Sequence, residues 1–140
     1  MERIQIKIHR IEENLAIVRS IKDDCFEKFS NDPIYRGALL HYLFIISDSC
    51  IALAELIIKH KKLKTPQYYA DAIDILGESG IIEPEFAYHF AKIAGFRNFL
   101  AHDYEKIDKM ILCGEIINKL ADVEEYLRQI KKSVGLWNQS

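Results

Sequence analysis

Hydrophobic positions recur at helical spacing along most of the chain. In the first segment they fall alternately four and three residues apart, the spacing of one face of a helix, at Ile4, Ile8, Ile11, Leu15 and Val18. The pattern continues loosely through Cys25 and Phe29, which predicts a long first helix. No stretch alternates cleanly between apolar and polar residues, and the sequence has no Asn-Gly or Asp-Gly turn, so no strand is predicted.

Prolines divide the rest of the chain into further helices. Four more helices are predicted to begin at Asp32-Pro33, Thr65-Pro66, Glu83-Pro84 and Asp108. In the first two, a residue that can cap a helix precedes a proline, which suits the first helical position. The second helix should run to about Lys59 and the third should end at Gly80, with Tyr69 on its apolar face. The fifth carries an apolar face that starts at Ile111.

These elements predict an all-α protein: a single-domain antiparallel bundle of about five helices, two of them long. The domain should cover residues 1–135, with residues 136–140 as a loose C-terminal tail. With 140 residues, 49% of them hydrophobic, and only 6 Gly and 3 Pro, the chain has enough apolar surface for a core and few helix breakers. A disordered or linker-rich protein is therefore excluded.

Charge and hydropathy narrow the function classes further. The formal net charge is −2, which argues against a highly basic protein that coats nucleic acid, so any anion site must be a local patch. The apolar run of residues 38–58 is long enough to span a membrane, but it contains Asp48 and Glu55. A carboxylate near the bilayer centre costs about 2.5 kcal/mol or more, so this run is interpreted as a core helix and no membrane partner is expected.

The cysteines and the N-terminus indicate a cytoplasmic protein. Cys25, Cys50 and Cys113 lie far apart in the sequence and are odd in number, so they cannot form a closed disulfide set. They are interpreted as buried free thiols in a reducing compartment. The first residues contain no apolar run, so no signal peptide is expected.

Several well-known catalytic patterns are missing from the sequence. There is no glycine-rich phosphate loop, no serine nucleophile elbow, and no His-Glu-x-x-His pattern. The five histidines include no tight pair at metal-ligand spacing. Neither a metal nor an organic cofactor is therefore expected.

One compact segment, residues 97–104, combines a permanent cation, an imidazole and a phenol. On a helix, Arg97 and His102 would point about 140° apart. They could act together with Tyr104 if the fourth helix stopped near Leu100 and left His102 and Tyr104 on an extended exit, where alternate residues share one side.

Arg97 has no ion-pair partner at helical spacing, because Ile93 and Ala101 lie four residues before and after it. Its charge therefore requires a distant carboxylate or an anionic ligand. Asp48, in the apolar second helix, is either a purely structural partner or a residue that orients Arg97. Cys50 is interpreted as a core residue, and the basic residues 59–64 as a solvated turn that could also contribute to a groove.

The segment resembles a known family. Arg97, four intervening residues, His102, one residue and Tyr104 match the motif of HEPN-domain proteins, including the polar Asn98 after the arginine. The wider sequence resembles the HepT branch over essentially the entire chain, with its apolar second helix, Pro66-Gln67-Tyr68-Tyr69-Ala70 and Gly80-Ile81-Ile82. Ala101 replaces a bulkier aliphatic residue that this branch often has before the histidine.

The resemblance implies a homodimeric, metal-independent ribonuclease toxin of a toxin–antitoxin pair, acting on RNA and in some members on tRNA. Arg97 and His102 would be catalytic, Asn98, Tyr104 and Asp48 supporting, and two motifs would line one cleft. The implied partner is a minimal nucleotidyltransferase antitoxin similar to MntA, which can silence the toxin by transferring AMP to Tyr104. The chain itself lacks the Gly-Ser and paired-Asp signature of that antitoxin.

Two other function classes remain open at the level of sequence. The chain could be a non-catalytic substrate-binding or scaffold subunit of a nucleotidyltransferase, which the near-neutral charge mildly favours. A small-molecule sensor bundle has no feature in its favour beyond an apolar interior.

Overall fold

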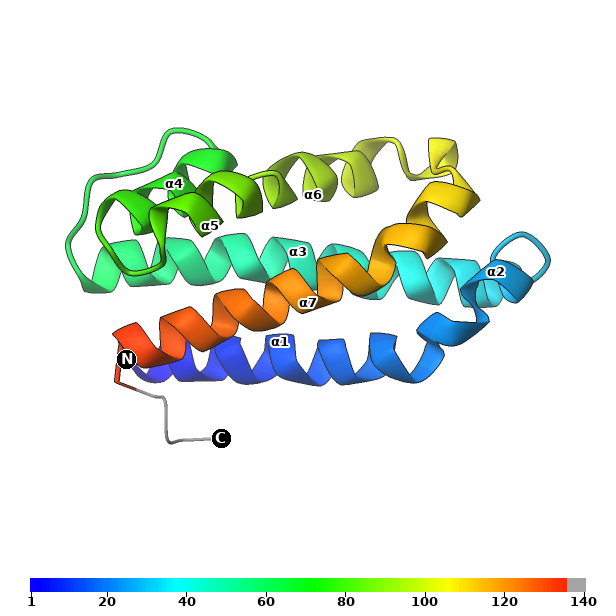
Figure 1. Cartoon of the computed structure of the whole chain (residues 1–140), viewed down its shortest axis with the longest axis horizontal. Helices are drawn as coiled ribbons and strands as arrows, with labels where there is room; N and C mark the ends of the chain where they lie inside the picture. The colour runs from blue at the N-terminus through cyan, green and yellow to red at the C-terminus, as the bar shows by residue number, and fades with distance from the viewer. Residues whose placement is uncertain (136–140) are drawn as a thin grey trace.

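The computed structural model describes residues 1–135 and shows a bundle of helices (Figure 1). The helices are α1 (Glu2–Ile21), α2 (Cys25–Lys28), α3 (Pro33–His60), α4 (Tyr69–Glu78), α5 (Pro84–Phe90), α6 (Ile93–His102) and α7 (Lys109–Ser133), with 3-10 turns η1 (Lys22–Asp24) and η2 (Tyr104–Lys106). The predicted all-α antiparallel bundle is confirmed. The predicted tail, residues 136–140, lies outside the described residues, and the extent of the domain stays a prediction.

Three long helices, and not the two predicted, form the body of the bundle. α1, α3 and α7 run side by side, and the shorter α4, α5 and α6 lie along the opposite side of α3 (Figure 1). The five apolar positions predicted for the first helix are all buried: Ile4, Ile8, Ile11, Leu15 and Val18. α3 is long and apolar enough to cross a membrane by length and composition alone, but 56% of its most apolar window is buried inside the bundle. That burial favours its role as the central core helix.

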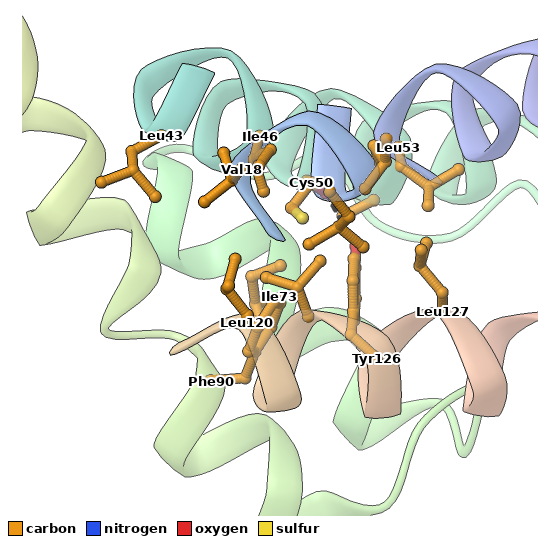
Figure 2. Close-up of a cluster of buried hydrophobic side chains, with 14 of the residues drawn as sticks. Val18, Leu43, Ile46, Cys50, Leu53, Ile73, Phe90, Leu120, Tyr126 and Leu127 are labelled. Atoms are coloured by element: carbon orange, nitrogen blue, oxygen red, sulfur yellow. Dashed lines mark hydrogen bonds between the residues drawn. The ribbon is translucent and has the colours of Figure 1, made fainter. Parts of the chain in front are cut away.

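Polar contacts fix α7 against its neighbours. The buried Tyr126 hydroxyl donates a hydrogen bond to the Cys50 carbonyl of α3 at 2.7 Å, at the centre of the core cluster (Figure 2). Lys131 pairs with Glu12 of α1 at 2.6 Å. Tyr126 and Cys50 are both fully buried, and burial raises the pKa of each. Both side chains therefore stay neutral at physiological pH, and the prediction that Cys50 is a core residue is confirmed.

Some helix boundaries differ from those predicted. The first helix ends at Ile21, and the 3-10 turn η1 separates it from the four-residue α2. The third begins at Tyr69 and not at Thr65-Pro66, because the Asp71 carboxylate accepts the backbone N–H groups of Gln67 and Tyr68 and so caps that later start. The fifth begins as predicted, with the Asp108 side chain accepting the N–H of Ile111 at 3.1 Å.

The predicted fourth helix is divided into α5 and α6. At the break, the N–H of Ala94 donates to the Ala91 carbonyl at 3.1 Å, a tighter turn than that of an α-helix. α5 also packs closely on α4, where a Cβ added to Gly77 would come within 2.5 Å of the Ala87 Cβ. Only glycine fits this crossing. Two residues predicted to face inward are exposed: Tyr69 is 40% exposed and Ile111 is 60% exposed. Both lie in the first turn of their helix, where the core no longer covers them.

The interpretation of all three cysteines as free thiols is wrong for two of them. Cys25 of α2 and Cys113 of α7 form a disulfide with a Cα–Cα distance of 5.6 Å, and only Cys50 is free among the described residues. The two cysteines are 88 residues apart in the sequence. The spacing of the cysteines in the sequence does not indicate this pair, because α2 comes to lie beside the start of α7 only when the antiparallel helices pack (Figure 1).

Candidate active site

Arg97 is held in place by three kinds of contact. Its Nε donates a hydrogen bond to the Asp48 carboxylate of α3 at 2.9 Å, and its Nη1 donates to the Asn98 side-chain oxygen at 3.2 Å. The guanidinium also lies over two aromatic rings, at 5.1 Å from the centre of Phe44 and 4.9 Å from that of Tyr69. Such cation–π contacts and the forked geometry of arginine restrict the guanidinium to one orientation.

This arrangement identifies the ion-pair partner of Arg97. The distant carboxylate is Asp48, 49 residues away in sequence, and the Arg97 side chain is only 18% exposed while that of Asp48 is 46% exposed. Arg97 uses Nε for the carboxylate and one N–H of Nη1 for Asn98, which leaves the remaining Nη donors for another acceptor. An oxyanion such as a phosphate is the acceptor that this arrangement fits best.

The aromatic partners of Arg97 were missed at the level of sequence. Phe44 lies four residues before Asp48 on α3, so both side chains share one helix face and a signal was present. Tyr69 had no comparable signal, since it was placed on the core face of its helix and lies instead at the exposed start of α4.

His102 does not take the extended position that would have aligned it with Tyr104. α6 continues to His102, and the Asp103 N–H still donates to the Phe99 carbonyl at 2.8 Å. The condition that the helix stop near Leu100 is not met, because Ala101 is a strong helix former and nothing breaks the helix before Asp103, where the backbone leaves the α conformation. Tyr104 then falls in the 3-10 turn η2.

The motif residues therefore face different ways within one protomer. His102 and Asn98 are exposed and lie four residues apart on one face of α6. Arg97 points toward α3, about 140° around the helix from His102. Within residues 1–135, the His102 side chain makes no hydrogen bond or ion pair. The structure brings Arg97, Asp48 and Asn98 together and leaves His102 free at the helix end.

Tyr104 is 52% exposed and lies in the wall of a groove of about 930 Å³ between α3 and the end of α6. Asn98 lines a second groove, of about 480 Å³, together with Tyr69. Neither Arg97 nor His102 lines these two grooves. In the part of the chain that the structure describes, no three His, Cys, Asp or Glu side chains are grouped so that they could hold a metal ion.

Known proteins with similar sequences and folds point to a single family. A curated relative, the mRNA nuclease HepT of Shewanella oneidensis, is 25% identical over 104 residues, which are 74% of this chain and 78% of that protein. The tri-AMPylated HEPN toxin of the same organism, solved in complex with its MNT antitoxin, is 24% identical with a TM-score of 0.82, over 92% of this chain and 96% of that one.

A second solved structure shares the fold alone. The cytosolic Bacillus subtilis protein YutE, of unknown function, is 18% identical with a TM-score of 0.79, and the match covers 99% of this chain and 94% of that chain. The family model of HepT-like ribonucleases matches residues 11–130, which include every helix from α2 to α6 and the entire motif. The chain therefore belongs to the HepT-like ribonuclease family.

Proposed function

We propose that this protein is a ribonuclease toxin that cleaves RNA without a metal ion, with Arg97 and His102 as its catalytic residues. The observation that carries the proposal is the fixed guanidinium of Arg97, which keeps free N–H donors although Asp48 and Asn98 already hold it. A purely structural arginine would use its donors within the fold. Here they are available for a phosphate, near an exposed histidine at the end of the same helix.

The chemistry requires only groups that these residues supply. The ribose 2′-hydroxyl attacks the neighbouring phosphorus, its proton passes to a base, and an acid protonates the departing 5′-oxygen. Histidine titrates near pH 6.5 and can fill either proton-transfer role. Arg97 stabilises the negative charge that develops on the phosphate oxygens. Asp48 acts as a positioning residue, because it holds Arg97 and does not itself reach the reacting atoms.

We infer that the active site is completed by a second copy of the chain. One protomer offers a single motif histidine, and in that protomer Arg97 and His102 diverge by about 140° around α6. In a two-fold dimer the same surface meets itself, so two copies of α6 could contribute two arginines and two histidines to one cleft. This geometry would provide both a base and an acid for the reaction.

Tyr104 is the proposed target of regulation. The Shewanella toxin is AMPylated and bound to an MNT antitoxin, and by similarity we propose that a minimal nucleotidyltransferase transfers AMP to Tyr104 of this chain. The Tyr104 side chain is accessible, being 52% exposed. An adenylyl group there would add negative charge and bulk beside the site, and would repel RNA. Such a pair would work in the cytoplasm, where mRNA and tRNA are both available as substrates.

A non-catalytic scaffold for a nucleotidyltransferase is the second candidate, and the net charge of −2 favours it because RNA binding usually draws on many basic residues. Expression in bacteria separates the two. We expect the wild-type chain alone to arrest growth, and co-expression of its minimal nucleotidyltransferase partner to relieve the arrest. The His102→Ala variant should be harmless. Arrest that persists in the His102→Ala variant would contradict the catalytic proposal, and no arrest by either protein would favour the scaffold.

Mass spectrometry of the co-expressed pair tests the regulation. With ATP present, the peptide that contains Tyr104 should gain mass in steps of one adenylyl group, and the Tyr104→Phe variant should gain none. An unmodified Tyr104 in an inactive complex would show that the partner inhibits by covering the site.

A further inference from the structure

One groove beside the motif is not explained by the Arg97 and His102 chemistry. It holds about 930 Å³ and lies between the N-terminal half of α3 and the end of α6 with η2. Tyr104 forms part of its wall, so the groove continues directly from the motif. Its lining residues are Phe29, Pro33, Arg36, Gly37, Leu40, His41, Phe44, Leu100, Ala101, Tyr104, Glu105 and Ile107.

The buried and the exposed residues of this groove differ in chemistry. The floor is apolar, with the buried Leu40 and Leu100 and the partly buried Phe44. Two exposed rings, those of Tyr104 and His41, also line the groove. An apolar floor with exposed rings in the same groove suits a planar aromatic group, and a nucleobase is such a group.

Arg36 supplies the positive charge of the groove. Its Nη1 donates to the Phe29 carbonyl at 3.1 Å, which anchors the guanidinium at the groove wall. Within residues 1–135, no carboxylate lies within ion-pair distance of Arg36, although Glu105 lines the same groove. A fixed guanidinium without a carboxylate partner is complementary to a phosphate.

From these features we propose that the groove is a nucleotide subsite of the RNA substrate, with a base on the apolar floor beside Tyr104 and its phosphate on Arg36. The inference rests on the proposed ribonuclease function and deepens it. The subsite would hold the nucleotide next to the bond that is cut, because Tyr104 belongs both to the motif and to the groove wall. Arg36 and the groove would then contribute to RNA affinity and to the choice of cleavage position, and they take no part in proton transfer.

Gly37 allows the groove to be filled without damage to the fold. It lies in α3 and lines the groove, and a Cβ added there meets no atom within 4 Å. Leucine favours a helix more than glycine does, so Gly37→Leu should fold and should occupy part of the groove. Gly114 in α7 is a matched control, because its added Cβ is equally unobstructed and it does not line the groove.

The test measures binding of a short fluorescein-labelled single-stranded RNA by anisotropy, in a His102→Ala background that cannot cut it. Gly37→Leu should weaken binding about tenfold, the effect of losing one stacked base, and Gly114→Leu should leave it unchanged. Arg36→Ala should also weaken binding and should lower the salt dependence by about 0.7 in log–log slope, the value for one phosphate contact on a single strand.

The outcomes separate this proposal from the proposed function. Unchanged binding by Gly37→Leu, or an equal loss in Gly114→Leu, would overturn the subsite. In that case the ribonuclease proposal would still stand, provided that the wild type cuts RNA and His102→Ala does not. Absence of both cleavage by the wild type and RNA binding by the His102→Ala protein would overturn both proposals. Circular dichroism of each variant confirms that the helices are present.

Discussion

The centre of the bundle and the end of α6 use their side chains in opposite ways. Around Cys50 and Tyr126 the side chains are fully buried, and the Tyr126 hydroxyl donates to the Cys50 carbonyl (Figure 2). Among the described residues, no buried side-chain nitrogen or oxygen lacks a hydrogen-bond partner. At the end of α6, Arg97 keeps free donors while His102 and Tyr104 are exposed. The first region stabilises the fold. The second has donors and side chains that the fold does not use and that remain available to bind a ligand. Substitutions in the two regions should therefore affect different measurements.

The largest effect is expected from His102→Ala. General acid–base catalysis contributes about 10²- to 10⁴-fold in rate, so cleavage of a labelled RNA should fall by at least about a hundredfold. The free energy of unfolding should change by less than about 0.5 kcal/mol, because His102 is exposed and makes no described hydrogen bond. Chemical denaturation of the wild type and of His102→Ala measures the change in the free energy of unfolding. A variant that unfolds easily would show that His102 belongs to the fold and not to the chemistry.

Leu53→Ala should produce the opposite result. Leu53 is fully buried on α3, and truncating such a leucine leaves a cavity that costs about 2–5 kcal/mol of the free energy of unfolding. The cleavage rate of the folded fraction should stay near that of the wild type. Urea denaturation and initial rates at low temperature measure the two quantities. Loss of rate without loss of stability would show that the two regions are not independent.

The disulfide adds a second stabilising device to the body of the bundle. Cys25 and Cys113 close a loop of 88 residues, and a native disulfide of this kind contributes about 2–5 kcal/mol, mainly by restricting the unfolded chain. Dithiothreitol should therefore lower Tm in the wild type. In the Cys25→Ser variant, which has no bond to lose, it should have no effect. An equal Tm of the oxidised and reduced wild type would mean that the bond adds no stability.

Asp48 links the two regions, since it lies on the core helix and holds Arg97. Asp48→Asn keeps the shape of the side chain and removes its charge, so Arg97 should be less firmly held. We expect the cleavage rate to fall about tenfold, as for the loss of one charge-assisted hydrogen bond, with KM affected less than kcat. The Asp48→Glu variant should recover part of the rate. No change in either constant would show that the pair is only structural.

The smallest effect is expected from Glu125, at the surface of α7. Hydrogen bonds from Arg128 and Gln129 lower its pKa to about 2. Because the pKa is lower in the folded state, the stabilisation is present above pH 4.5 and is lost as the pH falls toward 2. The carboxylate is largely solvated, so the gain should be under about 1 kcal/mol. Unfolding of the wild type and Glu125→Gln should differ at pH 7 and converge near pH 2.

The sequence predicted the body of the bundle better than the site. The face of α1 followed from periodicity alone, since burying an apolar stripe is a local requirement of an amphipathic helix. The motif residues were also found from their order in the chain. The geometry of the motif residues could not be predicted, because it depends on α3 and α4. Phe44 and Tyr69 contact Arg97 only after these helices pack against α6.

The misplaced start of the third predicted helix has a local cause. Thr65-Pro66 is a good start signal, but the Asp71 side chain captures the preceding N–H groups and moves the start of α4 to Tyr69. The fourth predicted helix is divided between Phe90 and Ile93, and no proline or glycine in the sequence marks that break. The disulfide joins cysteines that only the packed helices bring together. A local side-chain cap therefore decided the start of α4, and tertiary packing decided the disulfide.

The most direct test of the account is the chemistry of the RNA ends produced in the presence of excess EDTA. The 2′-hydroxyl mechanism predicts that the wild type still cuts, that the upstream fragments carry 2′,3′-cyclic phosphates, and that both Arg97→Ala and His102→Ala abolish these fragments. Cleavage that stops on chelation, or that leaves a 3′-hydroxyl, would contradict catalysis by these side chains.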